Sequence, residues 1–197
     1  ARVYKQPLER ILEDLKAVGL DSLPGGGAEV FSPRVRELVC KGKISGERWL
    51  EVIRVAHRMG IPSTATMLYG HVETIEERVI HLERLRSLQD ETGGFRAFIP
   101  WTLSPHGTPR MSQFEPAGGA DYLKTLAVSR LFLDNILNIQ SGWLTEGLKL
   151  GQVGLSFGAN DIGGTLIEDK VLEPTGIEVK TRPEDLIRLI KEAGYAP

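Results

Sequence analysis

The stretch Thr64-Ala-Thr-Met-Leu-Tyr-Gly70 is a short apolar and β-branched run that ends in glycine, and the capping box Thr74-x-x-Glu77 predicts a helix directly after it. A second such run, Phe95-Arg-Ala-Phe-Ile-Pro-Trp101, follows that helix. A strand, a helix and another strand in this order form a βαβ unit, whose two strands lie parallel in one sheet. The stretch therefore predicts an α/β fold.

The same alternation of helical and β-type segments continues toward both ends of the chain. Further strands are expected near Leu20, over Asn138–Trp143 and at Asn160, which makes five strand candidates in all. Helices are expected over residues 8–18, from Ser32-Pro33, from about Ser45 to Met59, from Ala120 to about Asn135, and from a cap at Thr181-Arg-Pro-Glu184 to Gly194. No linker or fixed repeat separates these elements, so residues 1–197 are expected to form a single domain.

Two further expectations concern the helical histidines and one long loop. His57 and His81 lie inside helical patterns and are expected to be half-buried or at the surface. The stretch Thr102–Gly119, which includes His106, is polar, rich in Pro and Gly, and long for a connection. Loops of this kind often carry function, so we expect it to belong to an active site.

The composition excludes several classes of protein. Cys40 is the only cysteine, so the chain can form no internal disulfide, no cysteine-based zinc site and no iron–sulfur cluster from its own thiolates, since a cluster needs about three or four. The net charge of -2 gives no reason to expect a nucleic acid or an anionic membrane as partner. No apolar run approaches the roughly 18 residues of a spanning helix, and no targeting signal is evident, so a cytoplasmic location is expected.

Polar residues follow the predicted strands, at the edge where parallel sheets place their chemistry. Gly25, Gly26 and Gly27 would let backbone N–H groups approach a ligand, or would form a flexible turn. Glu29 would accept hydrogen bonds from a ribose or an amine, or would cap the helix that begins near Ser32. Five such groups at five successive strand ends predict one pocket for a polar ligand.

The remaining candidates each have a structural alternative. His71 and Glu73 would act as acid and base or bind a hydroxyl-rich ligand, and no metal site is expected because no third ligand is near them in the sequence. Trp101 and Trp143 would stack on a heterocycle of the substrate or pack in the core. The pair Asn160-Asp161 would contact a polar ligand or form an Asx turn.

Several segments resemble one enzyme family. They are Leu23-Pro-Gly-Gly-Gly-Ala-Glu29, Thr64–Thr74, Leu88–Phe95 and Ala97-Phe-Ile-Pro-Trp101, and they are similar to the radical S-adenosylmethionine enzymes of the futalosine route to menaquinone, a branch that includes the deazaflavin-cofactor synthases. Leu133–Ile136, Asn138-Ile-Gln140 and Phe157–Thr165 resemble the cyclic dehypoxanthinyl futalosine synthases most, with the aminofutalosine synthases as the alternative. The similarity covers nearly the whole chain.

The resemblance implies that this chain, with about five βα units, is the C-terminal part of a radical S-adenosylmethionine (β/α)8 TIM-type barrel. In such an enzyme a [4Fe-4S] cluster cleaves S-adenosylmethionine, and the 5′-deoxyadenosyl radical abstracts a hydrogen atom from a nucleoside substrate, here dehypoxanthinyl futalosine, which then cyclises. The function implied is thus a radical cyclase or transferase of menaquinone biosynthesis.

The resemblance also implies roles for individual residues. Gly25–Glu29 and either Arg34 or Arg36 would hold the ribose and carboxylate of S-adenosylmethionine, since a guanidinium matches a carboxylate bidentately. Gly70 and Glu73 would frame the adenine. The residues that would face the substrate are Thr66, Trp101, Asn160 and Asp161.

The chain departs from the family because the Cys-x-x-x-Cys-x-x-Cys loop that carries the cluster is missing, and Cys40 at a predicted helix end cannot replace it. The cluster ligands are therefore expected outside this chain, in an N-terminal half-barrel or a partner chain that completes the site. Two other functions stay open. One is a cluster-free nucleoside-binding subunit, and the other is a barrel lyase or isomerase that uses His71 and Glu73 as acid and base.

Overall fold

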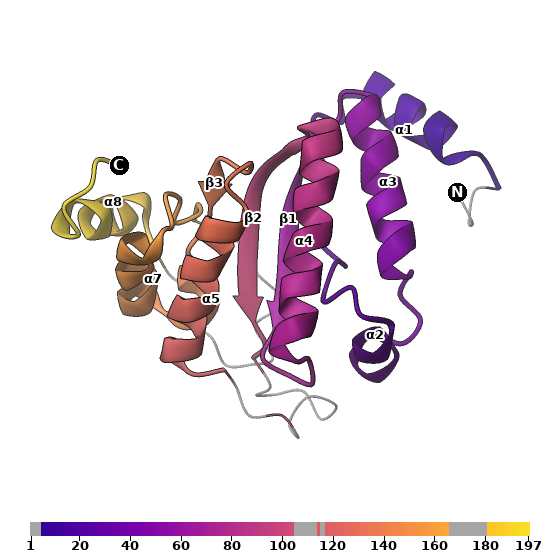
Figure 1. The fold of residues 1–197 in the computed structure, drawn as a ribbon. Helices are drawn as coiled ribbons and strands as arrows, with labels where there is room; N and C mark the ends of the chain where they lie inside the picture. Colours follow the sequence, from indigo (N-terminus) through magenta and orange to yellow (C-terminus); the bar gives the residue numbers. More distant parts are fainter. Residues whose placement is uncertain (1–4, 105–113, 115–116, 166–180) are drawn as a thin grey trace.

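Parallel strands form the centre of the structure, a computed structural model that describes residues 5–104, 114, 117–165 and 181–197 (Figure 1). β1 (Ser63–Tyr69), β2 (Phe95–Thr102) and β3 (Asn138–Ile139) form one sheet in the order β1-β2-β3 with both pairings parallel. Isolated parallel bridges place Leu23 beside Ser63 and Asp161 beside Gln140. Five segments therefore lie side by side in sequence order, as successive βα units do.

Three of the five expected strands are shorter than the sequence predicts. Near Leu20 the pairing is confined to Leu23, because the next residue is Pro24, which has no N–H to donate to a ladder. The strand expected over Asn138–Trp143 was wrong beyond Gln140, since the chain turns there into the short helix α6 (Trp143–Glu146). The strand expected at Asn160 is a single bridge at Asp161.

Helices α4 (Ile75–Thr92) and α5 (Gly119–Phe132) cover one face of the sheet. The other helical elements are α1 (Leu8–Ala17), α2 (Pro33–Val39), α3 (Gly46–Arg58), α7 (Leu148–Gly154), the 3-10 turn η1 (Leu155–Phe157) and α8 (Pro183–Glu192). Figure 1 shows α4 and α5 in front of the strands, with α3 beside α4, and the two chain ends on opposite sides. No helix in the described ranges combines the length and the apolar character needed to cross a bilayer.

The helix boundaries confirm most of the predicted caps. Ser32 and Ser45 accept hydrogen bonds at the starts of α2 and α3, and Thr74 with Glu77 forms the complete capping box of α4. The last helix is capped from Arg182 rather than Thr181, and α5 ends three residues earlier than expected. Most of the predicted loop between Thr102 and Gly119, including His106, lies outside the described residues.

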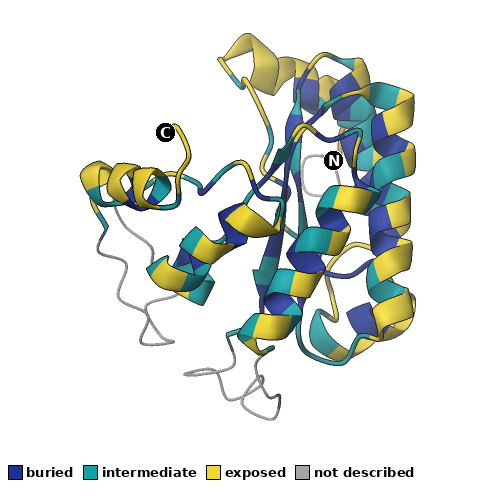
Figure 2. Ribbon diagram, turned by 60° about the vertical axis from the view of Figure 1, so that its left-hand side comes forward, coloured by how far each residue is buried: buried dark blue, intermediate teal, exposed yellow. Residues whose placement is uncertain are grey.

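The sheet has one face packed against helices and one face that is more open. Along β1, Ser63, Ala65, Met67 and Tyr69 are buried, while the alternate residues Thr64, Thr66 and Leu68 are only partly buried. Figure 2 shows the same division at the level of the fold, with buried residues along the strands and on the inner sides of the helices. The main hydrophobic core runs from Ala28 to Ala159 and so includes residues from most of the described elements.

His57 of α3 is buried against the sheet, so the expectation of a half-buried or surface position was wrong. Its Nδ1 lies 2.7 Å from Thr92 Oγ1 and its Nε2 lies 2.9 Å from Ser63 Oγ. The Thr92 hydroxyl donates to the carbonyl of Leu88, so it accepts from a protonated Nδ1. Burial lowers the pKa of His57 to about 4, and the ring is neutral at pH 7.

His81 is fully buried under β1, and the sequence expectation was wrong here too. Its ring stacks on Phe31 with centroids 4.1 Å apart, and its Nε2–H donates to the carbonyl of Thr66 at 3.0 Å. Burial lowers the pKa of His81 to about 3 despite this hydrogen bond. The sequence could not show either burial, because each depends on an acceptor supplied by another element.

Candidate functional site

A cavity of about 330 Å³ lies on the more open face of the sheet. The sheet register explains its floor, since Thr66 pairs with Ile99 and Leu68 with Trp101, and these side chains alternate with those that face the helices. The cavity is lined by Pro24, Gly25, Gly26, Gly27, Glu29, Thr64, Thr66, Leu68, Ile99 and Trp101. Six of the residues predicted from the sequence are therefore together: Gly25, Gly26, Gly27, Glu29, Thr66 and Trp101.

Two threonine hydroxyls attach the glycine loop to β1. The Gly25 N–H donates to Thr64 Oγ1 at 2.8 Å, and Thr66 Oγ1 donates to the Gly25 carbonyl at 2.7 Å. A Cβ at Gly25 would lie 2.6 Å from the carbonyl oxygen of Thr64, closer than any real side chain could approach. Position 25 therefore requires glycine. Backbone pairing with β1 ends at Leu23, and the two threonine hydroxyls continue the contact between the segments beyond it.

Trp49 and Arg36 stabilise the same glycine loop by hydrogen bonds to its carbonyl groups. The indole N–H of Trp49 donates to the Gly26 carbonyl at 3.1 Å. Arg36 is 6% exposed, and its guanidinium donates to the carbonyls of Gly27 at 3.2 Å and Ala28 at 2.7 Å. We infer that Arg36 shapes the loop, because its donors are directed to protein carbonyls. Trp49 was not predicted as part of the site, because its only signal in the sequence is its place on the apolar face of a helix.

Glu29 brings a carboxylate to the rim of the cavity. Its backbone has φ 49°, in the left-handed region, and its carbonyl accepts from the Leu68 N–H at 3.2 Å. Its side chain is 10% exposed and Oε1 lies 2.5 Å from Lys43 Nζ. Helix α2 is capped by Ser32, so Glu29 does not have the capping role that was its alternative. The carboxylate also lines an adjacent cavity of about 240 Å³ that includes Cys40, Lys43 and His71.

Arg34 lies away from the cavity. Its side chain is 50% exposed, and its guanidinium pairs with Glu77 at 2.6 Å and donates to the Val72 carbonyl at 2.6 Å. The hydrogen bond from Arg34 lowers the pKa of Glu77 to about 2. The structure therefore places Arg34 as a brace between α2 and the start of α4.

The turn after β1 is closed by Glu73. Its carboxylate accepts from the N–H groups of Gly70 at 2.7 Å and His71 at 2.9 Å, and from Arg78 Nε at 2.9 Å. Burial alone would raise the pKa of Glu73, but hydrogen bonds from the His71 side chain and the two backbone amides outweigh it and lower the pKa to about 2. Glu73 is thus an ionised, 1% exposed anchor of the turn.

His71 takes part in the same closure. Its Nε2 lies 3.0 Å from the Leu68 carbonyl, and its Nδ1 lies 2.8 Å from the Val72 N–H and 2.8 Å from Glu73. Both ring nitrogens are engaged and the side chain is 1% exposed. This geometry favours a role for His71 and Glu73 in stabilising the turn over a role as acid and base.

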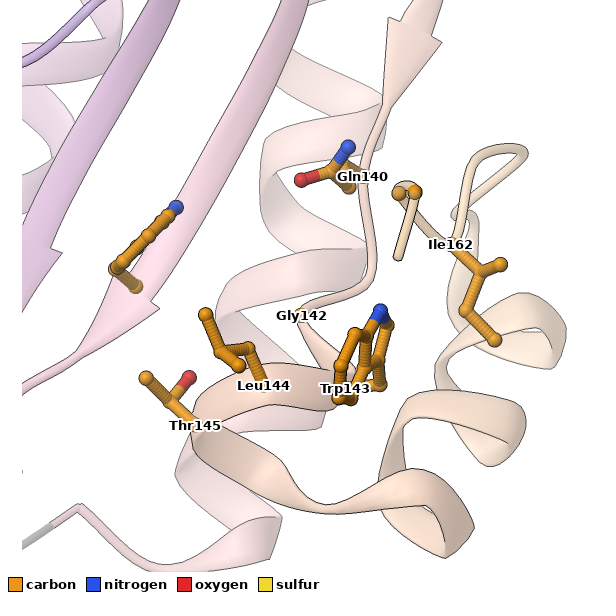
Figure 3. Close-up of a pocket in the computed structure, with 9 residues that line it drawn as sticks. Gln140, Gly142, Trp143, Leu144, Thr145 and Ile162 are labelled. Atoms are coloured by element: carbon orange, nitrogen blue, oxygen red, sulfur yellow. The ribbon is translucent and has the colours of Figure 1, made fainter. Parts of the chain in front are cut away.

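A second cavity of about 220 Å³ adjoins the first at Trp101 (Figure 3). Figure 3 shows Gln140, Trp143, Leu144, Thr145 and Ile162 around it, and Trp101 and Gly142, Gly163 and Gly164 complete its lining. Trp143 is 6% exposed and packs against Leu186 and Leu189 of α8, so much of its surface belongs to the core. Gln140, which was not predicted as a site residue, directly follows β3 and lines this cavity.

Asn160 and Asp161 lie at the far edge of the sheet. The Asn160 Oδ1 accepts from the Ile139 N–H at 2.9 Å and from Arg130 at 2.6 Å. Asp161 Oδ1 accepts from the Gly163 N–H at 2.6 Å in an Asx turn, and Oδ2 accepts from Gln140 at 3.3 Å. Both residues line a further cavity of about 400 Å³. The predicted single pocket is therefore divided into neighbouring cavities.

Two family models match the chain and together cover most of it. Residues 92–197 match the CofH/MqnC C-terminal region, and residues 3–85 match the Radical SAM superfamily. The chain belongs to the CofH/MqnC family. Enzymes of the Radical SAM superfamily use S-adenosylmethionine and a [4Fe-4S] cluster, and the parallel α/β arrangement is that of part of their TIM-type barrel.

Three curated relatives of this CofH/MqnC family chain carry different enzyme names. The aminodeoxyfutalosine synthase of Thermus thermophilus is 45% identical over all of this chain and 54% of its own length. The cyclic dehypoxanthine futalosine synthase of Streptomyces coelicolor is 42% identical over all of this chain and 49% of its own length. A 5-amino-6-(D-ribitylamino)uracil–L-tyrosine 4-hydroxyphenyl transferase of Methanopyrus kandleri is 40% identical over all of this chain and 55% of its own length. The chain thus spans about half the length of the curated relatives it matches.

Proposed function

We propose that the chain contributes the C-terminal barrel segments of a radical S-adenosylmethionine enzyme that cyclises dehypoxanthinyl futalosine in the futalosine pathway to menaquinone. The observation that carries the proposal is the pair of adjoining cavities at Trp101, one lined by the glycine loop and Glu29 and the other by aromatic and apolar side chains. Such a pair offers neighbouring places for a nucleoside cofactor and a nucleoside substrate. The chemistry requires a reducing compartment, so the proposed location is the cytoplasm.

The residues present fit S-adenosylmethionine. A cavity of about 330 Å³ is in the range of small-molecule sites, and a Cβ at Gly26 would meet nothing within 4 Å, so the loop leaves open space there. Glu29 would accept hydrogen bonds from ribose hydroxyls. Gly70 and Glu73, expected from the sequence to frame the adenine, do not line this cavity, and Glu73 is instead a buried anchor of the turn after β1. Thr66 fixes the loop from the cavity floor. When bound and reduced at the cluster, the cofactor supplies a 5′-deoxyadenosyl radical.

The residues present do not fit a [4Fe-4S] cluster. Cys40 is the only cysteine of the chain, and no group of three or more His, Cys, Asp or Glu side chains in the described ranges could hold a metal ion. The cluster ligands of the proposed enzyme would therefore come from other residues, in an N-terminal half-barrel or a partner chain. What this chain provides is the walls that exclude water and bring the two nucleosides together.

Aminodeoxyfutalosine synthesis is the second candidate, favoured by the 45% identity to the Thermus thermophilus enzyme. The test is anaerobic reconstitution of the complete enzyme, this chain together with the residues that supply the cluster ligands, with iron, sulfide and a reductant, followed by addition of S-adenosylmethionine and dehypoxanthinyl futalosine. Formation of 5′-deoxyadenosine together with a cyclised nucleoside supports the proposal. 5′-Deoxyadenosine without the cyclised product would contradict the cyclisation while leaving radical chemistry, and the second candidate, in place. No 5′-deoxyadenosine from the reconstituted enzyme would contradict the radical cyclase and favour a cluster-free binding subunit.

A further inference from the structure

Trp101 is the residue that the two cavities share. It lies at the C-terminal end of β2, beside Leu68 of β1, and among the described residues it is the only one that lines both the 330 Å³ and the 220 Å³ cavity. A ligand in either cavity meets this indole. Trp101 is therefore placed to contact the groups that must come closest during a transfer between cofactor and substrate.

The indole N–H of Trp101 is buried and finds no hydrogen-bond acceptor in the part of the chain that the structure describes. A buried donor without a partner is costly, so most such groups in proteins are paired. Trp49 shows the ordinary case, since its indole N–H donates to the Gly26 carbonyl at 3.1 Å. The unpaired donor of Trp101 points to a ligand that supplies the acceptor.

The surroundings restrict what that acceptor is. No described residue that lines either cavity is Lys or Arg, and the larger cavity carries the carboxylate of Glu29. A ligand carboxylate at this point would be desolvated with no cation beside it, which is unfavourable. A neutral oxygen of a carbonyl, ether or hydroxyl group meets the requirement, and the indole face offers apolar surface to the rest of the ligand.

We propose that Trp101 positions the nucleoside substrate at the junction of the two cavities by donating its indole N–H to a neutral oxygen of that substrate. This inference rests on the proposed function. It goes beyond stacking, because it assigns a directional contact that a phenyl ring at the same position could not make.

The test is two-dimensional ¹⁵N–¹H spectroscopy of the native protein with labelled indole nitrogens, before and after addition of dehypoxanthinyl futalosine. The chain holds three tryptophans, and the resonance of Trp101 is identified by its loss in the variant Trp101→Phe. We expect the Trp101 indole proton to move downfield with substrate and Trp101→Phe to weaken substrate binding by about tenfold in calorimetry. Its affinity for S-adenosylmethionine is expected to fall less than its affinity for the substrate, because the phenyl ring keeps apolar contact with that cavity and only the substrate loses a hydrogen bond.

Trp49→Phe is the matched control, because it removes an indole N–H that the protein already satisfies. This variant is expected to weaken S-adenosylmethionine binding rather than substrate binding. A Trp101 resonance that moves with S-adenosylmethionine alone, or one that stays in place when substrate binds, would overturn the assignment to substrate while the proposed function stands. Failure of the wild-type protein to bind the nucleoside would overturn both.

Discussion

Acidification is expected to destabilise the protein through its two buried histidines. The pKa values of His57 and His81 are about 4 and about 3 in the folded state, against about 6.5 in the unfolded chain. Because the folded pKa is the lower one, the unfolded state takes up protons first as the pH falls below about 6.5. Below that pH, each ring lowers the free energy of unfolding by close to 1.4 kcal/mol per pH unit. The two rings together therefore lower the free energy of unfolding by about 4 kcal/mol between pH 7 and pH 5.

Two carboxylates with low pKa values act outside this window. Glu73 and Glu77, whose pKa values are about 2, lose their contributions only below about pH 4.5. Burial raises the pKa of Glu146, so protonation of this carboxyl offsets part of the histidine effect without changing the difference between wild type and a histidine variant. The assay is urea unfolding followed by circular dichroism at pH 7.0, 6.0, 5.5 and 5.0, on the wild-type protein and on His57→Asn, whose amide can still donate to Thr92. The variant is expected to show half of the wild-type pH dependence. A flat wild-type profile, or equal dependence in the variant, would refute the reasoning.

Three further changes test how the site is held. Gly25→Ala is expected to cost about 1–3 kcal/mol of stability, since its Cβ would meet the carbonyl of Thr64, and a thermal melt matching wild type would show that the loop relaxes freely. Thr66→Val is expected to lose about 1 kcal/mol of S-adenosylmethionine affinity in calorimetry, with Thr66→Ser restoring it; equal losses in both would point to shape rather than the hydroxyl. Arg78→Gln leaves Glu73 buried without its cation and is expected to cost about 3–5 kcal/mol in urea unfolding, partly recovered by adding Glu73→Gln, and no recovery would contradict the charge argument.

The parts of the fold that were predictable are those set by neighbours in sequence. The capping box of Thr74 and Glu77 and the glycine at position 93 are local features, and the structure confirms both ends of α4. The glycine loop and Trp101 line one cavity because they stand at the C-terminal ends of neighbouring parallel segments, which meet at one edge of the sheet.

The rest depended on which distant group each side chain meets. Arg36 was expected to bind a ligand carboxylate, but its guanidinium donates hydrogen bonds to the carbonyls of Gly27 and Ala28. Asn160 was expected to face substrate, but it bonds Ile139 across the sheet edge. A sequence shows the chemistry that a side chain offers and not the partner that folding brings to it.

The attachment of Gly25 to Thr64 and Thr66 couples the glycine loop to the sheet. The amide proton of Gly25 belongs to no strand, yet it is bonded to a side chain of β1, so a motion that separates the loop from Thr64 exposes it to exchange with solvent. A ligand that binds this loop would add its binding free energy to the cost of that separation. Ligand binding in the cavity should therefore slow hydrogen exchange at the edge of β1, where the Thr64 N–H donates to the Leu23 carbonyl, at an amide that the ligand does not touch.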